Sequence, residues 1–187
     1  MISSVCVFAG SNKGVNTSFS KAAEDLGKSL AISGITTVYG GGASGIMGSL
    51  ADSVIKNDGK IIGIVPKFLK SFEITNQHLS TLIITETMHE RKSFMYEKSS
   101  AFIALPGGIG TMDEVCEVLT WKKLHLHDKP IIFLNVNGFW TPFLTLLLQL
   151  QKAEFLLDNS KSLFSVVEST DQIMSLLLDS NRNASYE

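Results

Sequence analysis

Short apolar runs rich in β-branched residues alternate with longer stretches of helical periodicity along most of this 187-residue chain. Alternation on this spacing predicts a parallel sheet with helices packed on both faces. The apolar runs are continuous rather than interrupted at every second residue, which is typical of parallel strands buried on both sides. The runs that we interpret as strands are 5–9, 35–39, 61–65, 81–85, 101–105, 130–134 and 163–167, and the helical stretches are 17–32, 46–56, 88–98, 111–124, 139–154 and 171–178.

These elements predict an α/β fold, namely a Rossmann-like, doubly wound and mostly parallel sheet of about seven strands with helices on both faces. The length suits a single domain, which we place at residues 1–179. Residues 180–187 are mainly polar and are expected to form a C-terminal tail.

The composition argues against a broad attraction to polyanions. The chain has 16 Lys and Arg against 18 Asp and Glu, so its net charge is -2, and we expect neither nucleic acid nor a membrane surface as a partner. The first residues lack the basic segment and cleavage site of a signal peptide, and no apolar stretch has the length of a membrane span. Cys6 and Cys116 form no C-x-x-C pair, so we expect a cytoplasmic protein with free thiols.

Ligands of open parallel sheets bind beyond the carboxyl ends of the strands, so the residues that follow each predicted strand are candidates for a site. Gly10, Ser11 and Asn12 follow the first run, and the second is followed by GGGASG at residues 40–45. The run 81–85 leads into ETMHERK (86–92), and the run 101–105 leads into PGGIGT (106–111). Small, polar and charged residues therefore converge at one edge of the predicted sheet.

The loop PGGIGT is suited to binding a phosphate group. Its glycines let backbone N–H groups approach a ligand closely, and a helix that we expect to begin at Thr111 would favour an anion at its N-terminus. The alternative is a tight turn with a helix cap, because Thr111 and Glu114 have the spacing of a capping box. Three glycines within residues 107–110 favour phosphate binding by the loop. For Glu114, the capping-box spacing taken alone favours a role as a helix cap.

Residues 40–45 also match G-x-G-x-x-G, a pattern of dinucleotide-binding folds. The next predicted strand ends in Pro66 and Lys67, not in the acidic residue that would hold an NAD ribose. We therefore favour close packing of Ser11, Gly41 and Gly42 around a nucleotide or its ribose, and keep an NADP-dependent oxidoreductase as an alternative.

Two cations in the stretch 88–98 share one side of the predicted helix with apolar residues. That side carries Met88, Arg91, Lys92 and Met95, and the opposite side carries Glu90, Ser93, Phe94 and Glu97. The pattern fits either cations directed into a site or an ordinary solvated helix face.

No metal site and no serine nucleophile is expected. His125 and His127 form an H-x-H pair, but neither they nor His78 have a third ligand at suitable spacing. The chain also lacks the G-x-S-x-G and S-x-x-K patterns of serine enzymes.

Together these motifs resemble the LOG ("lonely guy") family of cytokinin-activating phosphoribohydrolases. PGGIGTMDE at 106–114 is similar to that family's P-G-G-x-G-T-x-x-E, and MHERK at 88–92 is similar to its M-H-x-R-K. YGGG at 39–42, GIMG at 45–48 and HLHDKP at 125–130 follow the family in order and spacing. The resemblance runs from about residue 5 to residue 157.

The resemblance implies a cofactor-free hydrolase of N-glycosyl bonds. Its substrate would be AMP or an N6-modified AMP such as N6-isopentenyl-AMP, and its products a free adenine-type base and ribose 5-phosphate. It implies catalytic roles for Arg91 and Glu114. It implies substrate contacts for Glu73, Met88, Lys92, Gly108, Ile109, Gly110, Thr111, Met112, Asp113 and Thr120.

The resemblance also implies a homodimer, for which the leucine-rich stretch 143–150 and Trp121 are the candidate contacts. Many relatives carry a lysine decarboxylase label. That reaction would require a lysine that holds pyridoxal phosphate, and no motif in this sequence marks one.

The implied reaction agrees with the chemistry of the residues. Cleavage of a ribosyl–nitrogen bond passes through an oxocarbenium-like cation, as glycoside hydrolysis does, and a carboxylate such as Glu114 stabilises it and activates water. Arg91 stays ionised and is a poor proton donor; it either holds Glu114 or binds the phosphate or ribose. A non-catalytic carrier of a nucleotide or of molybdenum cofactor remains the alternative, which would not need both residues.

Overall fold

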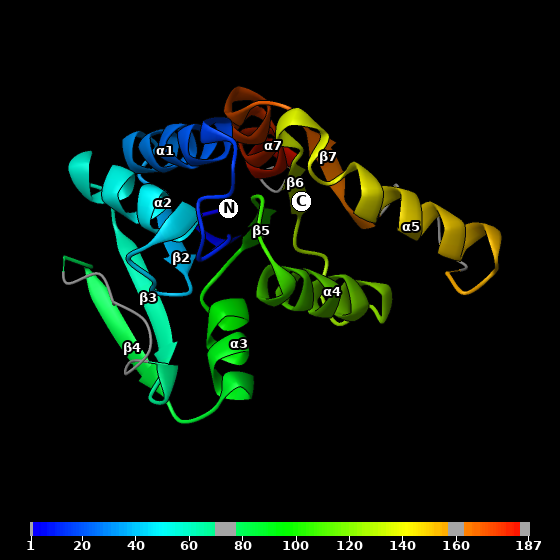
Figure 1. Cartoon of the computed structure of the whole chain (residues 1–187), viewed down its shortest axis with the longest axis horizontal. Coiled ribbons are helices and arrows are strands. Elements are labelled where there is room, and N and C mark those ends of the chain that lie inside the picture. Colours follow the sequence, from blue (N-terminus) through cyan, green and yellow to red (C-terminus); the bar gives the residue numbers. More distant parts are fainter. Residues whose placement is uncertain (1, 70–77, 157–162, 184–187) are drawn as a thin grey trace.

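The structure is a computed structural model that describes residues 2–69, 78–156 and 163–183. Within these residues seven strands form one sheet in the order β4-β3-β2-β1-β5-β6-β7, and every neighbouring pair is parallel (Figure 1). The strands are β1 (Ser4–Phe8), β2 (Thr36–Tyr39), β3 (Ile61–Pro66), β4 (Thr81–Thr85), β5 (Ala101–Ala104), β6 (Ile131–Leu134) and β7 (Ser165–Val167). The predicted α/β, Rossmann-like parallel sheet is confirmed.

Helices cover both faces of the sheet, as in Figure 1. They are α1 (Thr17–Ile32), α2 (Gly45–Lys56), α3 (Met88–Glu97), α4 (Ile109–Lys123), α5 (Thr141–Lys152) and α7 (Thr170–Asn183), with a short 3-10 helix η2 (Val136–Gly138) before α5. The buried side chains of α1, α2 and α7 belong to one core cluster, and those of α3, α4 and α5 belong to the other.

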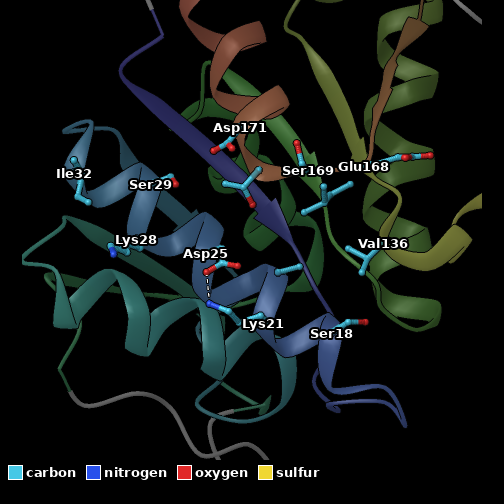
Figure 2. A pocket seen from close by; sticks show the side chains of 13 residues that line it. Ser18, Lys21, Asp25, Lys28, Ser29, Ile32, Val136, Glu168, Ser169 and Asp171 are labelled. Atoms are coloured by element: carbon cyan, nitrogen blue, oxygen red, sulfur yellow. Dashed lines mark hydrogen bonds and ion pairs between the residues drawn. The ribbon is translucent and has the colours of Figure 1, made fainter.

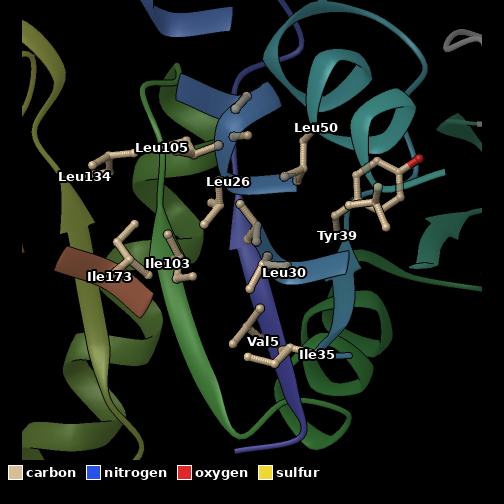
Figure 3. Packing of buried hydrophobic residues seen from close by; sticks show 14 of the residues in the cluster. Val5, Leu26, Leu30, Ile35, Tyr39, Leu50, Ile103, Leu105, Leu134 and Ile173 are labelled. Carbon is tan, nitrogen blue, oxygen red and sulfur yellow. The ribbon is translucent and has the colours of Figure 1, made fainter. Parts of the chain in front are cut away.

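The two cores follow from the alternation of side chains along each strand. On β1, Val5 and Val7 lie in the α1/α2/α7 core, whereas Cys6 and Phe8 lie in the α3/α4/α5 core. Figure 3 shows the first of these cores, where Leu30 of α1 lies near Val5, and Ile173 of α7 lies near Ile103. The five inner strands are thus buried on both faces, as predicted, whereas the edge strands β4 and β7 are largely exposed.

The strand order reverses beside β1, which lies between β2 and β5. Such a reversal leaves a crevice outside the carboxyl ends of the strands, where doubly wound folds bind ligands. The loops after β1, β2 and β5 therefore meet at one place, and the helices that follow them start there.

Three predicted helices differ from the structure by two residues or more. Helix α5 runs from Thr141 to Lys152 instead of 139–154. Helix α4 begins at Ile109 instead of Thr111, because Gly108 occupies the N-cap position without a side-chain hydrogen bond. Helix α7 continues to Asn183, so the first residues of the expected tail 180–187 are helical. Residues 184–187 lie outside the described residues, and the boundary of the domain stays a prediction.

The capping pattern S/T-x-x-E is realised at α3. Thr87 Oγ1 accepts a hydrogen bond from the Glu90 N–H at 3.1 Å, and Glu90 Oε2 accepts one from the Glu86 N–H at 2.8 Å. The first bond satisfies an N–H group that helix geometry leaves without a partner, and the second holds Glu86, the residue before the N-cap, to the helix. The start of α3, and with it the position of Arg91 one turn later, is fixed locally by its own sequence.

No helix in the described part of the chain is both long enough and apolar enough to cross a membrane.

His127 connects α4 to the segment that leads into β6. The Lys129 N–H donates to His127 Nδ1 at 3.1 Å, so Nε2 carries the proton that is shared with the Val118 carbonyl at 3.0 Å. Burial lowers the pKa of His127 below its ordinary value of 6.5, and the nearby Lys122 and Lys129 lower it further. The folded protein therefore holds the neutral ring.

We predict that this histidine contributes to acid sensitivity. Because its folded pKa is lowered, its contribution to stability is complete above about pH 6.5 and is lost as the pH falls through the folded pKa. The slope of the unfolding free energy against pH is proportional to the number of protons that the protein takes up on unfolding. Below about pH 6.5, His127→Gln should lower that number by up to one and so reduce the slope. Urea unfolding at several pH values measures that slope, and equal slopes for the two proteins would contradict the prediction.

Candidate active site

A buried ion pair joins α3 to α4. Arg91 Nη1 lies 2.8 Å from Glu114 Oε1, and the two side chains are only 9% and 8% exposed. Arg91 also donates from Nε to the Ile64 carbonyl oxygen of β3 at 3.1 Å. The guanidinium thus bonds one charged and one neutral acceptor, which is how a buried charge is tolerated.

The fold brings these groups together from three separate elements. Arg91 lies on the buried side of α3 with Met95, and Lys92 is only 12% exposed, so the predicted placement of both cations on the methionine side is confirmed. Glu114 lies in the second turn of α4, among its buried residues. The strand order places β3, α3 and α4 so that these groups meet.

The environment of Glu114 gives its carboxyl group the character of a base. Burial raises its pKa above the ordinary value of 4.5, and Arg91, through its charge and its hydrogen bond, opposes that rise. A buried carboxylate with a raised pKa takes up a proton more readily at neutral pH than an exposed one. General bases in enzymes are tuned in the same direction.

Lys92 forms a second connection between the two helices. Its Nζ lies 3.2 Å from Asp113 Oδ2 and 3.0 Å from Glu117 Oε1. Burial tends to lower the pKa of Lys92, but its hydrogen bonds to Glu117 and Asp113 raise it overall. The amine is therefore held charged between two carboxylates of α4, and its predicted contact with substrate stays a prediction.

Gly10 links the loops after β1, β2 and β5, which meet where the strand order reverses. Its N–H donates to the Pro106 carbonyl at 3.1 Å, and its own carbonyl accepts from the N–H groups of Ile46 and Met47 at 3.0 and 3.1 Å. The loop after β1 is thereby tied both to the PGGIGT loop and to the N-terminus of α2. The predicted convergence of these segments at one edge of the sheet is confirmed.

The positions of Ser11, Gly41 and Gly42 follow from these contacts. Ser44 Oγ donates to the Ser11 carbonyl at 3.2 Å, and a Cβ added at Gly45 would lie 2.2 Å from the Ser11 carbonyl carbon. Gly41 and Gly42 are buried, and Gly41 has a φ of +81°, a conformation that glycine adopts readily. Ser11 is exposed beside the start of α2.

The PGGIGT loop contains glycines with two different uses. A Cβ added at Gly107 would lie 2.1 Å from Thr111 Oγ1, so Gly107 is required for packing. A Cβ added at Gly108 or Gly110 would meet no atom within 4 Å. Packing within the described protein therefore does not require glycine at these two exposed positions, which suits an N-terminus where backbone N–H groups meet a ligand.

The capping-box interpretation of Thr111 and Glu114 is wrong. Thr111 is buried inside the first turn of α4, whose N-cap is Gly108. Glu114 bonds to Arg91 across the helix interface and lies in the second turn. The N–H groups of Ile109, Gly110 and Thr111 are the first of α4 and have no partner within the helix, so they are available to an anion.

The remaining predicted contacts lie at different distances from the ion pair. Met88 lies in the first turn of α3, Ile109 and Met112 lie in the first turn of α4, and Asp113 follows Met112 directly. Ile109 is 82% exposed. Thr120 lies further along α4, where its exposed hydroxyl donates to the Cys116 carbonyl at 2.7 Å. It follows Glu114 by six residues, about 9 Å along the helix axis. Glu73 lies outside the described residues.

Two groups of this site were not predicted from the sequence. Glu117 is a partner of Lys92, and its i,i+4 spacing from Asp113 on the same helix was a usable signal. The Ile64 carbonyl is a backbone acceptor, and no residue pattern marks such a group. Within residues 2–69, 78–156 and 163–183, no cluster of three His, Cys, Asp or Glu side chains could hold a metal ion.

In the described part of the chain, three grooves of about 500–590 Å³ are lined by residues other than Arg91 and Glu114. One groove of about 500 Å³ lies between α1 and α7 and is lined by Lys21, Asp25 and Asp171, among other residues (Figure 2). A small hollow beside the pair is lined by Glu114, Lys92 and Tyr96. The chemistry of its residues identifies the candidate site.

Fold and site together define a class: a Rossmann-like α/β protein with a buried Arg–Glu pair beside a glycine-rich helix N-terminus. The model of a family described as "Possible lysine decarboxylase" matches residues 47–177. A rice protein (Oryza sativa subsp. japonica), the probable cytokinin riboside 5'-monophosphate phosphoribohydrolase LOGL1, is 46% identical over 142 residues, which are 76% of this chain and 64% of that protein. The matched region thus spans slightly less than two thirds of this relative.

Other relatives are matched over more of their length. The cytokinin riboside 5'-monophosphate phosphoribohydrolase LOG4 of Arabidopsis thaliana is 37% identical over 173 residues, 92% of this chain and 80% of that protein. The chain belongs to the LOG family, as the motifs at 88–92 and 106–114 predicted.

Solved structures show the same fold at lower identity. A molybdenum cofactor binding protein from Rippkaea orientalis aligns with a TM-score of 0.70 at 24% identity, over 94% of this chain and 95% of that one. The molybdenum cofactor carrier protein of Chlamydomonas reinhardtii aligns with a TM-score of 0.71 at 18% identity, over 94% and 96% of the two chains. At these identities the similarity establishes the fold only.

We predict that Arg91→Ala destabilises the protein by about 3–5 kcal/mol at neutral pH, because it leaves the Glu114 carboxylate buried without its partner. The pKa of Glu114 should rise further, and a carboxyl group with a raised folded pKa loses its contribution to stability as the pH increases. The loss should therefore be smaller near pH 4 than near pH 8. Denaturant unfolding across this range measures it.

The double variant Arg91→Ala/Glu114→Gln is the control, because it lacks the buried Glu114 carboxylate. Its stability should depend less on pH than that of Arg91→Ala. An Arg91→Ala protein that is as stable as the wild type at pH 8 would show that the pair does not hold these helices together.

Proposed function

We propose that this protein is a phosphoribohydrolase that cleaves the N-glycosidic bond of a nucleoside 5'-monophosphate. Its products are a free adenine-type base and ribose 5-phosphate, and its substrate is AMP or an N6-modified AMP such as N6-isopentenyl-AMP. The observation that carries the proposal is the buried Arg91–Glu114 pair next to the open N-terminus of α4. The names of its LOG relatives support the same activity.

In this proposal the 5'-phosphate lies at the N-terminus of α4. The N–H groups of Ile109, Gly110 and Thr111 point to it, and the helix dipole favours its charge. Gly108 and Gly110 present no Cβ that would keep the phosphate from the backbone. Glu114 follows Ile109 by five residues, about 7.5 Å along the helix axis, which allows one nucleotide to reach both the helix end and the carboxylate.

Glu114 performs the central chemical role. Its carboxylate stabilises the positive charge that develops on the ribose as the bond from C1' to the base nitrogen breaks, and it accepts a proton from the attacking water. The oxygen of that water bonds to C1', and the electron pair of the broken bond leaves with the base, which takes up a proton. Arg91 holds the carboxylate in position and keeps it ionised before the reaction.

The protein is also proposed to be a cytoplasmic homodimer. Support for the dimer comes from α5, where only Phe143 is buried and Leu146 and Leu148 are each 47% exposed. Exposed apolar side chains on a helix favour a contact with another apolar surface. Trp121 of α4, the second candidate, is half-buried and packs edge-on against Tyr96 of the same chain.

We predict that Glu114→Gln lowers the rate of base release by about 10²–10⁴-fold, because an amide accepts no proton. Nucleotide binding should be retained, because the N-terminus of α4 is unchanged. The assay incubates purified protein with AMP or N6-isopentenyl-AMP and measures free base by chromatography. Calorimetric titration with AMP measures binding, and near-wild-type turnover would remove Glu114 from the mechanism.

The same assay decides between an enzyme and a carrier. A non-catalytic nucleotide or molybdenum cofactor carrier would bind its ligand without releasing base from either nucleotide. Values of kcat/KM for the two nucleotides then determine whether the base pocket prefers a prenylated adenine.

For the dimer, the double variant Leu146→Gln/Leu148→Gln should shift the protein toward monomer. Light scattering coupled to gel filtration measures the mass. A wild-type protein that is monomeric at all concentrations would contradict the dimer proposal without affecting the proposed reaction.

A further inference from the structure

The Arg91 guanidinium is confined on three sides. Nε bonds to the Ile64 carbonyl, Nη1 bonds to Glu114, and Nη2 lies against Gly40 at the end of β2. A Cβ added at Gly40 would lie 2.3 Å from Nη2 and 3.5 Å from Cζ of Arg91. Real Cβ contacts are not that short, so a side chain at position 40 would displace the guanidinium.

The backbone does not require glycine at this position. Gly41 and Gly45 have φ values of +81° and +66°, whereas Gly40 is not among the residues with positive φ. Another neighbour of the added Cβ is Met47 Sδ at 3.2 Å, which belongs to a flexible side chain that can move. The space taken by Arg91 is therefore the feature that excludes a side chain at Gly40.

We propose that Gly40 is a positioning residue for the Arg91–Glu114 pair, an inference that rests on the proposed function of that pair. Without a side chain at position 40, the guanidinium can bond to Ile64 and Glu114 at the same time. Because the guanidinium is planar and rigid, pushing Nη2 away from Gly40 strains or breaks one of these two bonds. The orientation of the Glu114 carboxylate then changes, although no residue that contacts substrate has been replaced.

The inference predicts a kinetic signature for Gly40→Ala. A small displacement of a catalytic group lowers kcat by about 10²-fold, whereas KM should change much less, because the N-terminus of α4 is intact. Arg91 opposes the rise in the pKa of Glu114 that burial causes. With that contact weakened, the pKa rises further, and the acid limb of the kcat–pH profile should move to higher pH.

A matched control is Gly59→Ala. A Cβ at Gly59 would also be crowded, at 2.5 Å from Ala31 Cβ and 2.8 Å from Val54 Cγ1, but Gly59 lies before β3, at the opposite edge of the sheet. Gly59→Ala should lose stability while its kcat, KM and acid limb stay at wild-type values. If crowding acted only by lowering stability, Gly40→Ala and Gly59→Ala would have the same kcat, KM and acid limb.

The second measurement is a double-mutant cycle on stability, which requires no activity. If Gly40 only makes room for Arg91, Gly40→Ala should be destabilising in the wild type and nearly neutral in the Arg91→Ala background. Should Gly40→Ala alone fail to fold, a folded Gly40→Ala/Arg91→Ala protein would support the inference by the same logic. A double variant that loses as much stability as Gly40→Ala does alone would overturn it.

These experiments separate the two proposals. A wild-type protein that releases no base from either nucleotide would contradict the proposed function, yet the stability cycle would still test the contact between Gly40 and Arg91. An active wild type together with a Gly40→Ala protein of unchanged kcat and acid limb would contradict the role of Gly40 alone.

Discussion

The ion pair between Arg91 and Glu114 is the interaction on which the rest of the site depends. Removing two charges from water is costly, and the cost is offset only when their geometry is close and other acceptors are satisfied. Here the guanidinium also bonds to the Ile64 carbonyl, so β3, α3 and α4 are held to one another by a single side chain. The burial that makes this pair costly also raises the pKa of Glu114, which is the property that the proposed reaction uses.

The glycine-rich loops act as spacers around this pair. Gly107 allows close packing against Thr111, and Gly40 leaves room for the guanidinium. Gly108 and Gly110, in contrast, face open space at the start of α4. The glycines of one loop can thus be present for different physical reasons. Only the atoms around each position show whether glycine is required by packing or leaves space for a ligand.

Much of the fold was predictable from local patterns. The continuous apolar runs placed all seven strands within one or two residues. For the five inner strands the reason is that burial on both faces requires apolar side chains on both, whereas the edge strands β4 and β7 are largely exposed. The side of α3 that carries Arg91 and Met95 was predictable from helical periodicity. The start of α4 was not, since the T-x-x-E pattern occurs at both helices and is a capping box only at α3. At α4 the glutamate has a stronger partner across the helix interface.

The sequence by itself determined the alternation of strands and helices, the family, and the residue types that can perform the chemistry. Periodicity records which face of an element is buried, and that information is local. The tertiary structure alone decided that Arg91 meets Glu114, that a backbone carbonyl of β3 completes the arginine's contacts, and that Gly40 borders its guanidinium. These contacts join segments far apart in the chain, and their geometry depends on the order of strands in the sheet, which no local pattern specifies.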